Sequence, residues 1–318
     1  MIQTVTGAIE PDALGRTLIH EHVRFHDETV AEQFPAFYDF DQELADAVEQ
    51  VKKAQGHGAA TIVDPTAMYG GRSVRFMQTV AERTGIQIVA CTGIYTYGHL
   101  PHYYGARDAD AIAAMFARDI DEGIQGTDAR AGFLKCAADE PGMTENVEKL
   151  HRACARASVR TGAPIMAHSR PASNTGPRQV EILLEEGVAP EKIQIAHTGD
   201  TDDLDYIERL LEMGVWIGLD RFGLALYLPD AQRVPTTVEL LRRGYGDRLF
   251  IGSDYATSLD WFPPEVEEQL YAAGAVDADW SMAYPFEKVL PALREAGVWD
   301  DDVERQVFEV NPRAWLTD

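Results

Sequence analysis

The chain has 318 residues, of which 45% are hydrophobic and 25% charged, and it carries a net charge of −24. These values are typical of a globular protein, and the excess of acid argues against nucleic acids and anionic membranes as partners. The three cysteines lack a C-x-x-C spacing, and the sequence shows neither a signal-peptide pattern nor an apolar stretch that could span a bilayer. We therefore expect a reduced, cytoplasmic protein.

Short apolar runs alternate with longer amphipathic segments through most of the sequence. The apolar runs predict buried parallel strands at 17–23, 59–64, 87–93, 131–137, 163–168, 192–197, 215–220 and 249–254. The amphipathic segments predict helices at 41–55, 72–83, 108–122, 144–161, 178–186, 202–212 and 236–243. Two further helices are expected near the C-terminus, at 285–296 and 301–309.

Eight strands with intervening helices predict a single (β/α)8 TIM barrel domain over residues 1–318. A turn or hairpin at 1–15 is expected to cap the barrel floor, and a long eighth loop is expected at 255–282. A doubly wound open sheet is the alternative, but the first strand is not followed by a glycine-rich phosphate loop.

The first predicted strand ends with two histidines, His20 and His22. In an extended strand these alternate side chains face the same direction, which makes half of a metal site. A pair of solvated or hydrogen-bonded histidines is the simpler alternative for an isolated H-x-H pattern. His151, by contrast, lies within a predicted helix and is expected to be exposed.

Four other polar residues fall at or near the carboxyl ends of predicted strands, where parallel barrels place their chemistry. They are Lys135, His168, His197 and Asp254. With the first two histidines they offer enough nitrogen and oxygen donors for a pair of divalent cations. Such a pair activates water and polarises a carbonyl or phosphoryl oxygen.

Lys135 is unusual because a lysine inside a buried strand carries a large desolvation cost. It could form an ion pair with Asp254 or with a glutamate. It could instead become carbamylated, since a neutral amine can capture carbon dioxide and bridge two cations as a carboxylate-like ligand.

The residues 20, 22, 135, 168, 197 and 254, in this order and on these strands, resemble the metal ligands of the phosphotriesterase branch of the amidohydrolase superfamily. The similarity covers nearly the whole chain. Further motifs resemble those of phosphotriesterase-like lactonases, at 92–97 (TGIYTY), 134–137 (LKCA), 139–142 (DEPG), 218–223 (GLDRFG) and 253–255 (SDY).

The resemblance implies a binuclear metal centre. The more buried cation would be held by His20, His22 and Asp254. The more exposed cation would be held by His168 and His197, with carbamylated Lys135 and a hydroxide as bridges. Zinc is the expected metal, and cobalt, manganese, iron or nickel also suit mixed nitrogen and oxygen ligands.

The resemblance also implies roles around the metals. Asp254 would move the proton from water to the leaving group. Tyr95 would contact the lactone ring, Arg221 would lie near the substrate entrance, and Tyr97 and Trp261 would line the substrate pocket.

The implied activity is the opening of acyl-homoserine or other aliphatic lactones by the bridging hydroxide, with promiscuous phosphotriesterase activity. A primary organophosphate triesterase (aryldialkylphosphatase) is the alternative, and both reactions suit a small neutral ester. A one-metal amidohydrolase such as a deaminase, or a non-catalytic barrel, are more distant alternatives. The resemblance further implies a homodimer.

Overall fold

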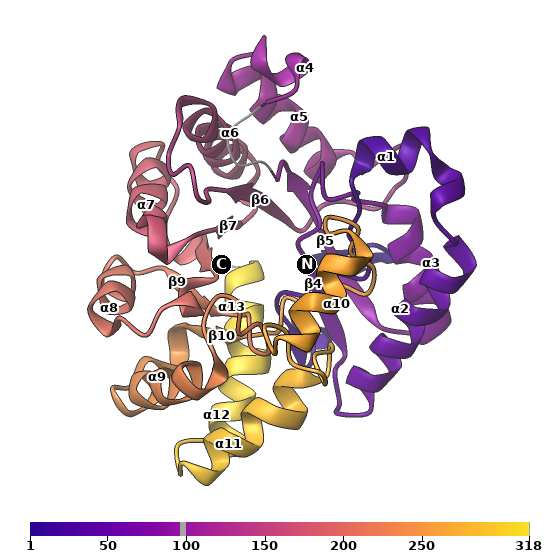
Figure 1. Cartoon of the computed structure of the whole chain (residues 1–318). Coiled ribbons are helices and arrows are strands. Elements are labelled where there is room, and N and C mark those ends of the chain that lie inside the picture. Colours follow the sequence, from indigo (N-terminus) through magenta and orange to yellow (C-terminus); the bar gives the residue numbers. More distant parts are fainter. Residues whose placement is uncertain (96–99, 318) are drawn as a thin grey trace.

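The computed structural model describes residues 1–95 and 100–317, which form a barrel of parallel strands surrounded by helices (Figure 1). Its strand order runs without interruption from the last strand to the first. The strands are β3 (Thr17–Leu18), β4 (Thr61–Asp64), β5 (Gln87–Gly93), β6 (Phe133–Ala137), β7 (Ile165–His168), β8 (Ile193–Ala196), β9 (Trp216–Leu219) and β10 (Leu249–Ile251). The ring closes just above β3 and β10, where His22 and Phe25 form parallel bridges with Ala256 and Leu259. The predicted TIM barrel is therefore confirmed.

Helices follow the strands and cover the outside of the barrel. They are α1 (Glu28–Gln33), α2 (Phe40–Gln55), α3 (Val74–Thr84), α4 (His102–Gly105), α5 (Ala109–Asp121), α6 (Glu145–Thr161), α7 (Thr175–Glu185), α8 (Leu204–Glu212) and α9 (Asp230–Arg242). Asp39, Thr144 and Asp203 cap the first turns of α2, α6 and α8 with their side chains. Gly85 and Gly162 end α3 and α6 in the left-handed conformation that glycine adopts without strain.

The floor and the C-terminal part differ in detail from the sequence prediction. The cap is a hairpin of β1 (Ile2–Thr4) and β2 (Gly7–Ile9), and the long eighth loop contains a helix, α10 (Pro264–Ala272). The terminal helices include two π-helical turns. The first, Pro285–Val289, continues as α11 (Leu290–Glu295), and the second, Gln306–Val310, follows α12 (Asp301–Arg305). A last helix, α13 (Asn311–Thr317), was not predicted.

Two predicted features on the outer helices are wrong. Helix α9 begins at Asp230, six residues before the predicted start, and keeps Pro235 inside it. His151 is completely buried in α6, because its Nδ1 hydrogen-bonds the Val147 carbonyl and its Nε2 meets Gln179. The apolar pattern of α6 did not indicate that the position of His151 is buried.

Side chains of the strands alternate between two apolar layers. The outward side chains pack against the helices in one large cluster, which includes Leu134 and Ile165. The inward side chains form a second cluster that fills the lower lumen, including Phe133, Met166, Phe250 and Trp315. This alternation follows from the two-residue repeat of a strand, and it leaves only the upper lumen for polar groups. None of the helices described is long and apolar enough to cross a membrane.

Candidate metal centre

The predicted ligands meet at the carboxyl ends of the barrel strands. The Nε2 atoms of His20 and His22 lie 3.2 and 3.1 Å from the same oxygen, Oδ1 of Asp254. The three ligand atoms form one group that could hold a cation. The His197 ring lies 4.8 Å from the His20 ring and 4.4 Å from the His168 ring, between centroids. Residues far apart in the sequence therefore converge on one point.

Two ligands leave their strands through an unusual backbone conformation. His197 has a φ of 61° and Asp254 a φ of 53°, both in the left-handed region that is uncommon for residues other than glycine. The His197 amide donates to Asp220 Oδ1 at 2.8 Å, which stabilises this turn. Both turns direct the side chains across the top of the lumen. Such backbone strain is typical of functional sites, and here it lies at the carboxyl end of the barrel.

Two polar side chains hold three of the imidazoles in place, and sequence reasoning assigned a role to neither of them. Asp220 lies with Oδ2 2.9 Å from His20 Nδ1 and with Oδ1 3.0 Å from His197 Nδ1. Thr66 Oγ1 lies 2.7 Å from His22 Nδ1. These contacts occupy Nδ1 and leave Nε2 of each ring for a cation.

The fourth imidazole, His168, is oriented in the opposite way. Its Nε2 lies 2.9 Å from Asp139 Oδ2, and its Nδ1 lies 3.3 Å from the Tyr95 hydroxyl. Its Nδ1 therefore faces Tyr95 and the cavity. His168 does not join either of the two groups of donors close enough to share an ion, which are His20, His22 and Asp254, and His20, His197 and Asp220.

Lys135 is buried within the same region, and its ion pair with Asp254 or a glutamate is not found among the described residues. Its Nζ lies 3.4 Å from His20 Nε2 and 3.4 Å from Met166 Sδ. Burial lowers the pKa of this amine to about 8, against the opposing effect of the carboxylates of Asp254 and Asp220. A larger neutral fraction of the amine favours carbamylation over a simple ammonium ion.

Burial also controls the charge of the other ligands. It lowers the pKa of His20 to about 4, so this imidazole is neutral and has a free lone pair near pH 7. Burial alone would raise the pKa of the Asp254 carboxyl, but the neighbouring imidazoles and the Arg221 guanidinium hold it well below its usual range. Neutral imidazoles and an ionised carboxylate are the forms that bind divalent cations.

The donor set therefore fits divalent transition metals. Each of the four imidazoles has one nitrogen engaged by an orienting group and the other turned inward. Nitrogen with carboxylate oxygen suits zinc and its neighbours, whereas calcium and magnesium prefer oxygen alone. The buried amine of Lys135 lies close to the same donors.

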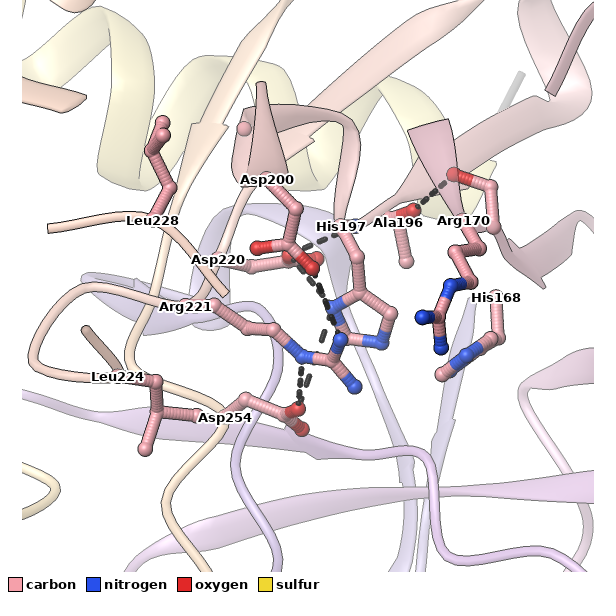
Figure 2. A network of polar contacts seen from close by, with 12 residues as sticks. His168, Arg170, Ala196, His197, Asp200, Asp220, Arg221, Leu224, Leu228 and Asp254 are labelled. Carbon is pink, nitrogen blue, oxygen red and sulfur yellow. Dashed lines mark hydrogen bonds and ion pairs between the residues drawn. The ribbon is translucent and has the colours of Figure 1, made fainter. Parts of the chain in front are cut away.

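Arg221 links Asp254 to a second layer of charges (Figure 2). Its Nε donates to Asp254 Oδ2 at 2.8 Å, and its Nη1 donates to Asp200 Oδ2 at 2.9 Å. Arg233 donates to the other oxygen of Asp200 at 2.7 Å. Arg221 was predicted near the substrate entrance. In the structure its side chain is only 7% exposed and restrains the Asp254 carboxylate.

A cavity opens above the donor cluster, and its walls are mainly apolar. Tyr95 and Trp261 both line it, with ring centroids 5.2 Å apart. Phe25 packs against Trp261 at 4.7 Å, a contact that the sequence did not indicate. Tyr97, also predicted to line the pocket, lies outside the described residues. The rest of the wall comes from loops after β9 and β10, including Leu224, Leu226, Leu259, Phe262 and Val276.

A parallel barrel with this donor set at its carboxyl end defines the class of binuclear metal-dependent hydrolases. Comparison with known proteins agrees. A sequence model of the Phosphotriesterase family matches residues 1–316. An aryldialkylphosphatase of Saccharolobus solfataricus is 46% identical over 98% of this chain and 97% of its own length.

Two further similarities come from Mycobacterium tuberculosis. A "Phosphotriesterase homology protein" is 36% identical over 98% of this chain and 96% of its own length. A solved structure of the phosphotriesterase superimposes with a TM-score of 0.93 and 35% identity, covering 99% of this chain and 98% of that chain. The chain therefore belongs to the phosphotriesterase family.

Proposed function

We propose that the protein opens lactones and hydrolyses phosphotriesters as a secondary activity. The observation that supports this most is an apolar cavity whose floor is the donor cluster. Such a cavity favours an uncharged substrate with an apolar substituent, and its floor would lie against the reacting carbonyl. The net charge of −24 points in the same direction, because it disfavours anionic substrates at long range.

In this proposal His20, His22 and Asp254 hold one cation, and His168 and His197 hold the other, with carbamylated Lys135 between them. Two bound divalent cations, zinc in the first instance, supply a water of lowered pKa and a Lewis acid for the substrate oxygen. Asp220, Thr66 and Asp139 keep the imidazoles in the orientation that binding requires.

The proton is handled by Asp254. Its Oδ1 faces the histidines, so Oδ2 is the oxygen that would take the proton from the attacking water and return it to the leaving alkoxide. Arg221 donates to this same oxygen, which fixes its direction and keeps the carboxylate weakly basic. A weak base releases its proton readily, as return to the alkoxide demands.

The two aromatic residues position the substrate. The Tyr95 hydroxyl lies beside His168 Nδ1, where it would donate to the ring oxygen or carbonyl of a lactone. Trp261 lines the cavity and is 36% exposed, so it would pack against an acyl chain.

An organophosphate triester as the main substrate is the second candidate. It is favoured by the 46% identity to a protein named aryldialkylphosphatase. The same donor cluster and the same apolar cavity suit a lactone and a triester alike. Which of the two is the preferred substrate therefore depends on how well its substituents fit the entrance of the cavity.

The experiment is a comparison of kcat/KM for an acyl-homoserine lactone, γ-decalactone and an aryl dialkyl phosphate, with metal analysis of the same sample. We expect two equivalents of metal per chain and a kcat/KM for a lactone that exceeds the triester value. A preferred triester would favour the second candidate. One equivalent of metal would favour a one-metal amidohydrolase, and no metal with no turnover would favour a non-catalytic barrel.

We also propose that the protein forms a homodimer. Phe34 and Phe37 lie between α1 and α2, are 56% and 74% exposed, and stack on each other with centroids 5.4 Å apart. Large exposed aromatic side chains are enriched at interfaces. Sedimentation of the protein should show a dimer, and Phe37→Glu should shift it to a monomer; a monomeric wild type would contradict the proposal.

A further inference from the structure

The loop after β3 and the loop after β10 run side by side above the barrel. The Phe25 amide donates to the Ser258 carbonyl at 2.9 Å, and the Thr257 amide donates to the His22 carbonyl at 3.1 Å. Side chains also join the two loops, and Asp260 is one of them. Asp260 Oδ1 accepts the Asp27 amide at 2.8 Å.

The second oxygen of Asp260 binds a residue further along the first loop. Its Oδ2 accepts the hydroxyl of Tyr38 at 2.6 Å. Burial and the adjacent carboxylate raise the pKa of Tyr38 well above its usual range, so the hydroxyl keeps its proton as a donor. The Asp260 carboxylate therefore holds two separate points of the β3–α2 connection at once.

Tyr38 is itself fixed in position. Its ring stacks on the His26 ring with centroids 4.4 Å apart, and His26 is buried. The His26 Nε2 lies 3.3 Å from a Glu43 oxygen in the first turn of α2, and the Arg24 Nε donates to its Nδ1 at 3.0 Å. The contact with Asp260 thus connects the eighth loop to a packed part of the barrel.

The segment on the other side of Asp260 has little support of its own. Helix α10 has no buried residue, although Leu270 and Tyr271 line the cavity. Trp261 follows Asp260 directly, and it contacts Phe25 and Tyr95 over the donor cluster. Asp260 is therefore the anchor at the start of the segment that forms the mouth of the cavity.

We propose that Asp260 and Tyr38 form a clasp that sets the position of Trp261 and thereby the range of substrate sizes the pocket accepts. Both are positioning residues, since neither lines the cavity. The clasp itself is independent of the reaction, while its effect on substrate size rests on the proposed function. Loss of either hydrogen bond would let residues 261–272 occupy more open positions, which weakens contact with a long substituent.

Hydrogen exchange tests the clasp without any substrate. In the metal-loaded protein, Tyr38→Phe and Asp260→Ala should each speed amide exchange in residues 261–272, by roughly tenfold for Asp260→Ala and less for Tyr38→Phe. Tyr245→Phe is the matched control, because the Tyr245 hydroxyl donates to Glu208 at 3.1 Å at the opposite end of the barrel. Equal exchange in wild type and both clasp variants would overturn the clasp.

Kinetics test the effect on specificity. For γ-decalactone we expect KM to rise about three- to tenfold in Asp260→Ala with kcat changed less, while γ-butyrolactone is nearly unaffected. The double variant should resemble Asp260→Ala, because that change already breaks the hydrogen bond between Tyr38 and Asp260. Equal changes for both lactones would overturn the specificity effect. A wild type that opens neither lactone would contradict the proposed function, and the exchange result would still decide the clasp.

Discussion

The lumen of the barrel contains two unlike regions on the same strands. In the lower lumen the inward side chains are large and apolar, such as Phe133 on β6 and Met166 on β7. Two residues further along each strand stand Lys135 and His168, in the upper lumen. The regions touch where Lys135 Nζ lies 3.4 Å from Met166 Sδ.

This difference shows how a single alternating pattern carries two tasks. The apolar side chains of the lower lumen, which we call the floor from here on, exclude water and charge, and their burial stabilises the fold. The upper lumen can then hold a lysine that forms no ion pair with the described residues, and two polar residues in the left-handed conformation, all of which cost stability. We expect the floor to govern stability and the upper lumen to govern chemistry, and the following changes test that division.

Lys135→Ala should have the largest effect. We expect the metal content to fall below two equivalents and activity to drop on the order of 10³-fold, the scale of losing a principal electrostatic group. Stability should fall less than in a truncation of the apolar lower lumen, because removal of the desolvated amine offsets part of the cost of the cavity that the variant leaves. Metal analysis and kinetics check this, with Lys149→Ala on α6 as the control. A variant that retains two metals and full turnover would break the division.

Phe250→Ala should do the reverse. Phe250 is fully buried in the floor, against Trp216 and Trp315. The cavity should reduce the free energy of unfolding by about 3–5 kcal/mol, while the metal content of the folded protein is unchanged. Denaturant unfolding measures this, with the exposed Val159→Ala on α6 as control. Loss of metal without loss of stability would contradict our interpretation of the floor.

Asp220→Asn tests the orienting groups of the upper lumen. The asparagine retains one acceptor, whereas Asp220 uses both oxygens on His20 and His197. We expect metal affinity to fall about 10–100-fold, a smaller effect than loss of a ligand. Titration with zinc under a competing chelator measures this. The surface variant Asp205→Asn should match wild type. If Asp220→Asn bound zinc with wild-type affinity, the orientation of the His20 and His197 rings would not depend on Asp220.

The sequence predicted the barrel strands, and the residues predicted as ligands meet near the carboxyl ends of those strands, for one physical reason. Both follow from position along a strand, because inward positions repeat every second residue and the ligands stand at strand ends. The orienting groups were missed because they act through space. Asp220 lies 200 residues from His20 in the chain, and its only signal was its place within the 218–223 motif.

Two of the differences from the predicted helices have causes that are also not local. Helix α10 has no buried residue, so its sequence lacks an apolar stripe that periodicity could detect. Helix α9 starts early, despite Pro235, because Arg233 is drawn to Asp200 and the Gly199 carbonyl. Tertiary contacts determine both, as they do the left-handed turns at His197 and Asp254.

The smallest expected effect concerns acid, and it belongs to the rim of the upper lumen. Burial, with a contribution from Arg24, lowers the pKa of His26 to about 4, while Asp260 opposes this shift and Glu43 and Tyr38 also face the ring. An unfolded histidine titrates near 6.5. The unfolded state therefore binds the proton more readily. The stabilisation is complete above about pH 6.5 and is lost as the pH falls towards 4.

His26→Gln should consequently make the protein less sensitive to acid. The difference in the free energy of unfolding between pH 8 and pH 5 should shrink by about 1 kcal/mol after allowance for screening, since the full shift is only partly traversed at pH 5. Urea unfolding at the two pH values measures it, with the exposed His102→Gln as control. Phe250→Ala should retain the acid sensitivity of wild type, because the floor that it disturbs contains no histidine. If instead Phe250→Ala and His26→Gln reduced it equally, acid sensitivity would not be confined to the upper lumen and its rim, and the two regions would not be separable in this respect.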